Sequence, residues 1–213
     1  MPMSIVERQT GRERRFPRWE PRTLGQMLDV AVKEFPDRPF VITDERTFSY
    51  HEIHTWSLRI AAGLIAAGVL PGNHVAVVLA NQPEFVAVKF AIALAGGVSV
   101  PINFLNRRDE LGYVLRQSDA VLLVTMDRFR ALDYLQALDE LSPGWELHGG
   151  GEAFPKLKKV IVYPASQRPL RAHVTSLHSM AMRLNTGVRR AGRIRRCRRT
   201  SSILPAPPGR PRA

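Results

Sequence analysis

The chain has 213 residues and a net charge of +12, so it can hold one ordinary domain with an extension. The charge excess lies entirely after Pro164, because residues 165–213 contain 12 arginines and no lysine, aspartate or glutamate. One cysteine excludes an internal disulfide and a cysteine-based metal site, and no apolar run reaches the roughly 20 residues that a membrane span needs.

Residues 1–22 are predicted to form a flexible basic arm. Arginines and glutamates mix along it, and no apolar segment of the signal-peptide kind follows, so we expect a cytoplasmic protein. A helix is predicted to begin at Thr23, whose hydroxyl can cap the first turn while Gln26 caps back. Its apolar residues share one face, and Pro36 ends it.

Two short strands are expected next, Phe40–Thr43 and Thr47–Tyr50, joined by a turn at residues 44–46. Ser49 and Glu52 then form a second capping box, which opens a helix that stops at Gly68. The run His74–Ala80 is almost wholly apolar, which is typical of a parallel strand buried on both faces.

This alternation of helix and strand continues to Tyr163. The further predicted strands are Val98–Ile102, Ala120–Thr125 and Lys159–Tyr163. The predicted helices run from Pro83 to about Ala95 with Asn81 as its cap, from Asn106 and Asp109 to about Gln117, and from Arg128 to Leu141. Short connections between alternating elements predict an α/β fold, a mostly parallel sheet covered by helices, over residues 23–164.

No catalytic constellation is evident in the sequence. The histidines have no metal-ligand spacing; they are His51, His54, His74, His148, His173 and His178. No serine sits in a nucleophile elbow, and no glycine-rich loop could cradle a phosphate. Gly96 and Gly97 are expected to end a helix and allow close packing, and Glu52 and Asp109 to cap helices. We therefore assign no catalytic, cofactor-binding or metal-binding residue.

Three segments carry a resemblance to a known family. Thr47–Ile53 reads T-F-S-Y-H-E-I, Leu70–Phe85 reads L-P-G-N-H-V-A-V-V-L-A-N-Q-P-E-F, and Ala91–Asn103 reads A-I-A-L-A-G-G-V-S-V-P-I-N. In order and spacing they resemble motifs of the adenylate-forming acyl-CoA synthetase superfamily, over about Thr23 to Tyr163. The resemblance implies that this is the first lobe of the ligase's N-terminal domain.

The resemblance also implies an activity for the intact family. Its members use ATP, Mg and coenzyme A: they join a carboxylic acid to AMP and then transfer the acyl group to coenzyme A. The three segments most resemble those of fatty or aromatic acyl-CoA synthetases. The family's phosphate loop, adenine motif, ribose-binding aspartate and catalytic lysine follow this lobe and have no counterpart here, so no catalytic role carries over.

Residues 165–213 are predicted to be a disordered tail, because they show no sustained periodicity and cannot bury enough apolar surface to offset their chain entropy. The codons of residues 200–213 can also be read one base out of register. In that frame, the first two bases of each codon from Thr200 to Ala213 become the second and third bases of a new codon. The new codons permit the sequence D-I-L-Y-T-S-G-T-T-G-x-P-K-G, which resembles the family's phosphate loop. We hypothesise a frameshift or sequencing error upstream of about Arg190, and no acyl-adenylate formation by this chain.

Three interpretations follow. The chain is a truncated, inactive lobe of an acyl-CoA synthetase; or a module whose basic tail binds nucleic acid or anionic membrane; or a fragment that complements a separately encoded remainder. No aromatic residue follows Tyr163, which counts against single-strand binding, and no specific nucleic acid is expected as a partner. An incomplete lobe would expose apolar faces, so we expect marginal stability and self-association.

Overall fold

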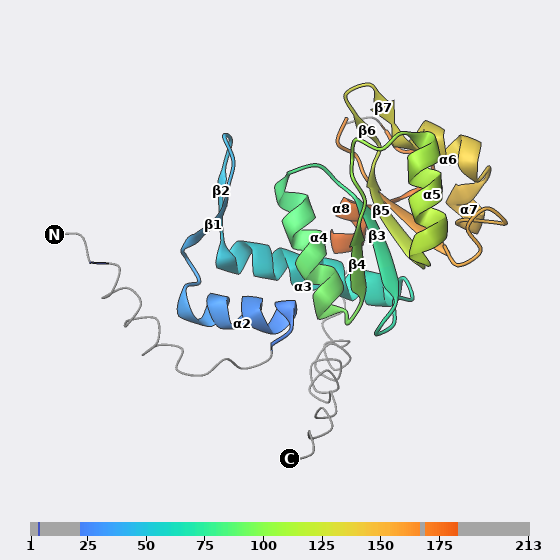
Figure 1. Ribbon diagram of the computed structural model, residues 1–213. Helices are drawn as coiled ribbons and strands as arrows, with labels where there is room; N and C mark the ends of the chain where they lie inside the picture. Colours follow the sequence, from blue (N-terminus) through green and yellow to red (C-terminus); the bar gives the residue numbers. More distant parts are fainter. Residues whose placement is uncertain (1–3, 5–21, 167–168, 183–213) are drawn as a thin grey trace, which may run out of the picture.

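The computed structural model describes residue 4, residues 22–166 and residues 169–182. Its centre is a parallel sheet with the strand order β4-β3-β5-β8-β9 (Figure 1). The strands are β3 (His74–Val78), β4 (Val98–Pro101), β5 (Leu122–Met126), β8 (Lys159–Tyr163) and β9 (Thr175–Ser176). The predicted α/β fold, with helices around a parallel sheet, is confirmed.

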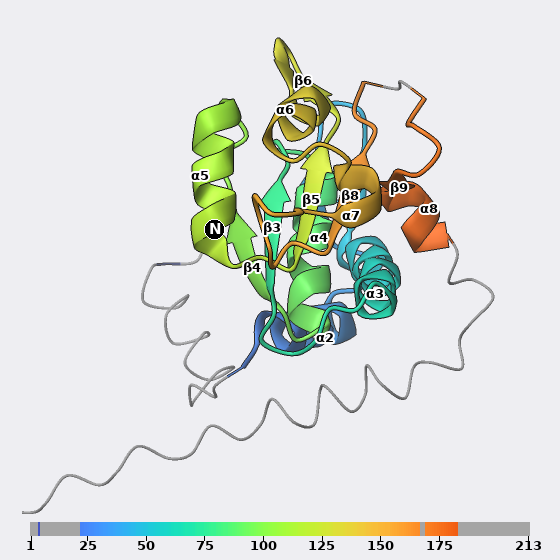
Figure 2. The same cartoon turned by 90° about the vertical axis from the view of Figure 1, so that its right-hand side faces the viewer.

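Helices cover both faces of this sheet. On one face lie α3 (Tyr50–Ala66), α4 (Pro83–Leu94) and α8 (Leu177–Met182), with α2 (Leu24–Glu34) packed outside α3 and α4. The other face carries α5 (Arg108–Ser118), α6 (Tyr134–Leu141) and α7 (Trp145–His148), as Figures 1 and 2 show. Because both faces are covered, residues 75–78 of β3 and all of β5 are buried.

The two predicted capping boxes are present. Thr23 and Gln26 exchange backbone and side-chain hydrogen bonds at the start of α2, at 3.2 and 2.8 Å. Ser49 and Glu52 do the same at the start of α3. The hairpin β1 (Pro39–Ile42) and β2 (Thr47–Ser49) lies between these helices and stands apart from the main sheet (Figure 1).

Two predicted N-caps are wrong by one residue, although α4 begins at Pro83 as predicted. Gln82, not Asn81, is the N-cap of α4, where Pro83 needs no backbone donor because it occupies the first turn. Arg107, not Asn106, is the N-cap of α5. Its backbone N–H donates to Glu110 at 2.9 Å, so Glu110 rather than Asp109 is the capping carboxylate.

The predicted helix Arg128–Leu141 is wrong in its first half. A small hairpin replaces it, formed by β6 (Arg128–Phe129) and β7 (Leu132–Asp133), with Arg130 in the left-handed region at φ 52°. The Asp133 side chain accepts the Gln136 backbone N–H at 3.0 Å and starts α6 there. The local Asp133 cap therefore starts the helix at Tyr134 and not at Arg128.

The prediction that order ends after Tyr163 is wrong for residues 169–182. Strand β9 pairs with β8, placing Thr175 opposite Ile161, and α8 follows it directly. Arg171 forms a bidentate ion pair with Asp139, at 2.8 and 2.6 Å, and a second pair with Glu146 at 2.6 Å. The remainder of the predicted tail, residues 183–213, lies outside the described residues, as does most of the predicted arm 1–22.

Candidate functional site

The carboxyl edge of the sheet is the natural place to look for a site. In chain order the strands run from β3 outward to β4 and then back across β3 to β5, so the strand order reverses at β3. Open parallel sheets bind ligands beyond the carboxyl ends of the strands at such a reversal. The segments that leave this edge begin at Leu79, Ile102, Asp127 and Pro164.

Asp127 organises the edge between β5 and β8. It is buried, its backbone N–H donates to the Tyr163 carbonyl at 3.0 Å, and its carboxylate accepts the backbone N–H of Arg128 at 2.8 Å. The same carboxylate accepts the Ser166 backbone N–H at 3.1 Å and the Ser166 hydroxyl. Asp127 therefore fixes where the chain goes after both strands, and its acceptor capacity is spent on that role.

Aromatic side chains fill the edge beyond β4 and β5. Phe104 and Phe129 meet edge-to-face with ring centroids 5.0 Å apart, and the Tyr134 hydroxyl donates to the Phe104 carbonyl. Burial raises the pKa of Tyr134 to about 12, so this phenol stays protonated. These contacts pack Phe104, Phe129 and Tyr134 together over this half of the edge.

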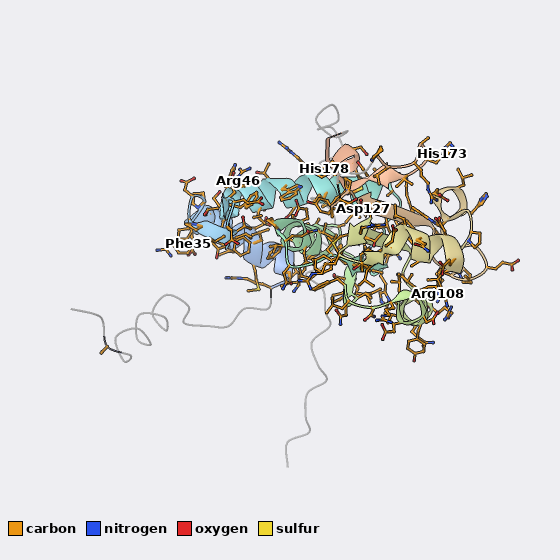
Figure 3. The ribbon with its side chains drawn as sticks, turned by 90° about the horizontal axis from the view of Figure 1, so that it is seen from above. Phe35, Arg46, Arg108, Asp127, His173 and His178 are labelled. Carbon is orange, nitrogen blue, oxygen red and sulfur yellow. The ribbon has the colours of Figure 1, made fainter. Side chains whose placement is uncertain are left out.

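The edge beyond β8 is different, because a cavity of about 170 Å³ opens there. Its walls are the side chains of Trp56 and Arg59 from α3, Glu84 from α4, Tyr163 from β8, and Leu177 and His178 from α8. We call this the Tyr163 cavity. Figure 3 shows His178 on α8, above the ribbon of α3.

Tyr163 and His178 form one aromatic wall of the Tyr163 cavity. Their rings stack with centroids 5.5 Å apart and planes 28° from parallel. Burial raises the pKa of Tyr163 to about 12, and the nearby Glu84 carboxylate adds to the shift. The Tyr163 hydroxyl therefore keeps its proton at neutral pH and serves as a hydrogen-bond donor.

The Tyr163 cavity carries one charge of each sign. Within the described part of the chain, no hydrogen bond or ion pair engages the guanidinium of Arg59, which is exposed. Glu84 is half-buried; it faces the Tyr163 hydroxyl and makes no ion pair with any described residue. Two opposite charges with aromatic neighbours can position a small dipolar molecule.

The sequence predicts no site residue, and His178 is among the histidines that lack metal-ligand spacing. The described residues contain no group of three or more histidine, cysteine, aspartate or glutamate side chains able to hold a metal ion. The other charged and aromatic walls of the cavity come from positions 56, 59, 84 and 163, on three different elements. No sequence pattern links them, so only the fold could bring them together.

Comparison with known proteins agrees with the observed fold. The profile of a family described as AMP-binding enzyme matches residues 28–174, which is more than half of the chain. The chain belongs to the AMP-binding enzyme family. YngI of Bacillus subtilis (strain 168), which carries an acyl-CoA synthetase name, is 34% identical over 145 residues. Triostin synthetase I of Streptomyces triostinicus is 33% identical over 135 residues.

These two alignments cover 65% and 63% of this AMP-binding enzyme chain but only 26% of each relative. The chain thus spans about a quarter of the length of the curated relatives it matches. The crystal structure of the anthranilate CoA ligase AuaEII, in complex with anthranoyl-AMP, superposes with a TM-score of 0.63 at 18% identity. It covers 75% of this chain and 28% of the ligase, and it supports the fold alone.

The matched region of the AMP-binding enzyme family reaches past Tyr163 to residue 174, immediately before β9. This agrees with the structure, in which residues 169–182 pack on the lobe rather than leave it. Among the described helices, none has the length and apolar character to cross a membrane.

Proposed function

We propose that residues 23–182 are the first lobe of an ATP-dependent carboxylate–CoA ligase. In the intact enzyme this lobe would form one wall of the site where a carboxylic acid is activated as its acyl adenylate and passed to coenzyme A. The observation that carries the proposal is the family match over residues 28–174, on a parallel sheet whose helices and motifs follow the family order.

The described residues do not fit ATP with its magnesium ion. Among these residues, the loops at the carboxyl edge are held by the contacts of Asp127 and by the aromatic contacts of Phe104. No glycine-rich loop of the kind that cradles a phosphate lies among the described residues. We therefore derive no chemical step for this chain, and we propose that the 213-residue polypeptide forms no acyl adenylate.

We further propose that the reading frame changes after Met182. Up to this point each segment makes contacts that depend on its sequence: Arg171 pairs with Asp139 and Glu146, and Met180 packs into a notch at Gly63. A chain translated out of register would not be expected to produce such complementary contacts. The phosphate-loop sequence that the other frame permits at Thr200–Ala213 supports the same proposal.

Two experiments test these proposals in turn. Sequencing the gene and its transcript across codons 160–230 tests whether the reading frame changes after Met182. A single unshifted frame that encodes the printed sequence through Ala213 would contradict the proposed change. For the lobe, the frame is restored in the gene and carboxylic-acid-dependent exchange of pyrophosphate into ATP is measured beside the 213-residue chain. We expect exchange only from the restored protein. Exchange by the printed chain would overturn the proposed inactivity, and none from either would overturn the ligase assignment.

A further inference from the structure

The Tyr163 cavity has features that the ligase assignment does not use. It lies between α3, α4 and α8, on the face of the sheet opposite α5, and its charged walls come from this lobe alone. The guanidinium of Arg59 has no partner in the described part of the chain, and the carboxylate of Glu84 meets only the Tyr163 hydroxyl there.

The charges limit what could bind. A simple carboxylate would gain the Arg59 guanidinium but would meet the Glu84 carboxylate in the same cavity, and a simple amine would have the reverse problem. A molecule with a carboxylate and an ammonium group satisfies both side chains at once. The Tyr163 hydroxyl, which keeps its proton, donates to the Glu84 carboxylate and holds it at the cavity wall.

The size of the cavity limits the rest of the ligand. A cavity of about 150 Å³ is known to hold one benzene molecule. At 170 Å³, the Tyr163 cavity therefore has room for an apolar body of about six carbons. Trp56, Leu177 and His178 offer that body aromatic and aliphatic contacts.

We propose that the Tyr163 cavity is a binding site for a small aliphatic α-amino acid. Arg59 binds its carboxylate, Glu84 binds its ammonium group, and its side chain lies against Trp56 and the stacked pair of Tyr163 and His178. The proposal concerns binding to this lobe, and it holds whether or not ligase activity returns when the frame is restored.

The test uses L-leucine and the 213-residue chain labelled with ¹⁵N. The indole N–H signal of Trp56, identified with the Trp56→Phe variant, reports binding directly. Two analogues isolate the charges: 4-methylpentanoate is leucine without its ammonium group, and 3-methylbutylamine is leucine without its carboxylate. We expect leucine to shift the Trp56 signal in a saturable way, and each analogue to bind about tenfold more weakly or worse.

Variants assign the two roles. Arg59→Gln should weaken leucine binding about tenfold. The control Lys89→Gln, which removes an exposed positive charge on α4 outside the cavity, should leave leucine binding unchanged. Glu84→Gln should abolish the preference for leucine over 4-methylpentanoate, whereas the exposed control Glu152→Gln should preserve it. Far-UV circular dichroism melts establish that each variant is folded. For a variant that fails to fold, the analogue comparison on the unmodified chain still decides the matter.

Several results would overturn the proposal. These are no shift of Trp56 at leucine concentrations up to about 10 mM, equal binding of leucine and 4-methylpentanoate, or unchanged leucine binding by folded Arg59→Gln. Equal binding of the two acids would identify a plain carboxylate site instead.

Discussion

The packing of α8 against α3 leads to a prediction in which the sign of the effect is decisive. At Gly63, near the C-terminal end of α3, an added Cβ would lie 2.9 Å from the Met180 Sδ and closer still to its Cγ. The Cγ atom is near the start of the side chain, so it cannot move aside without shifting α8. Gly63→Ala therefore introduces overpacking that costs about 1–3 kcal/mol.

Alanine also favours helix over glycine by about 1 kcal/mol in a helix interior, which opposes that cost. We expect Gly63→Ala to lower the free energy of unfolding by a net amount of about 1 kcal/mol, measured by urea denaturation. In the Met180→Ala background the clash is absent, so the same change at Gly63 should instead be neutral or stabilising.

The double-mutant cycle also provides the refutation. If α8 were not docked on α3, Gly63→Ala would stabilise the otherwise unchanged chain through helix propensity alone. An increase in the free energy of unfolding on Gly63→Ala, with no coupling to Met180→Ala, would show that the described contact does not form in solution.

Two further predictions concern the surface of the lobe. Hydrogen bonding to Arg171 is the main cause that lowers the pKa of Asp139, so this pair stabilises the fold above the ordinary carboxyl pKa of about 3.9 and loses its effect as the pH falls below that value. Arg171→Ala should cost about 0.5–1 kcal/mol at pH 7, since the pair is partly exposed, and should reduce the acid sensitivity of urea denaturation; an unchanged pH profile would contradict this. Ile42, on the isolated hairpin, is 73% exposed, and Ile42→Lys should reduce self-association in sedimentation velocity more than the control Leu147→Lys at a residue 65% exposed; equal effects would exclude the hairpin as the contact.

The sequence predicts those features whose causes are local. Thr23 with Gln26 and Ser49 with Glu52 cap their helices through residues three positions apart, so the signal is contained in four letters. The run after His74 is apolar because both of its faces are covered, and this also appears in sequence. The N-caps at Gln82 and Arg107 were missed by one residue, since neither has the side chain that normally marks a cap.

The Tyr163 cavity could not be predicted, for a different physical reason. Arg59, Glu84 and His178 lie on separate helices, and no spacing in the chain relates them. They become neighbours only because α3, α4 and α8 share one face of the sheet. Each of them considered alone is an ordinary helix-surface residue.

The end of the lobe was placed too early because its last elements are too short to show a period. Strand β9 has two residues and α8 has six, so their order depends on tertiary contacts. Composition supports the later boundary, because only two of the 12 arginines after Pro164 fall before Arg183. The arginine-rich composition therefore begins after Met182, and residues 165–182 had been grouped with a segment they do not resemble.

Two shortened chains test this boundary. A chain ending at Met182 keeps β9, α8 and the Arg171 contacts, so its free energy of unfolding should match that of the 213-residue chain within about 0.5 kcal/mol. A chain ending at Pro164 loses Leu177 and Met180, which are 2% and 7% exposed. Burial of each is worth about 1.5–3 kcal/mol, and part of this is offset by the entropy of ordering the segment. We expect the shorter chain to be less stable by at least about 2 kcal/mol, a large share of a domain's total. Equal stability of the two shortened chains would restore Tyr163 as the end of the ordered lobe.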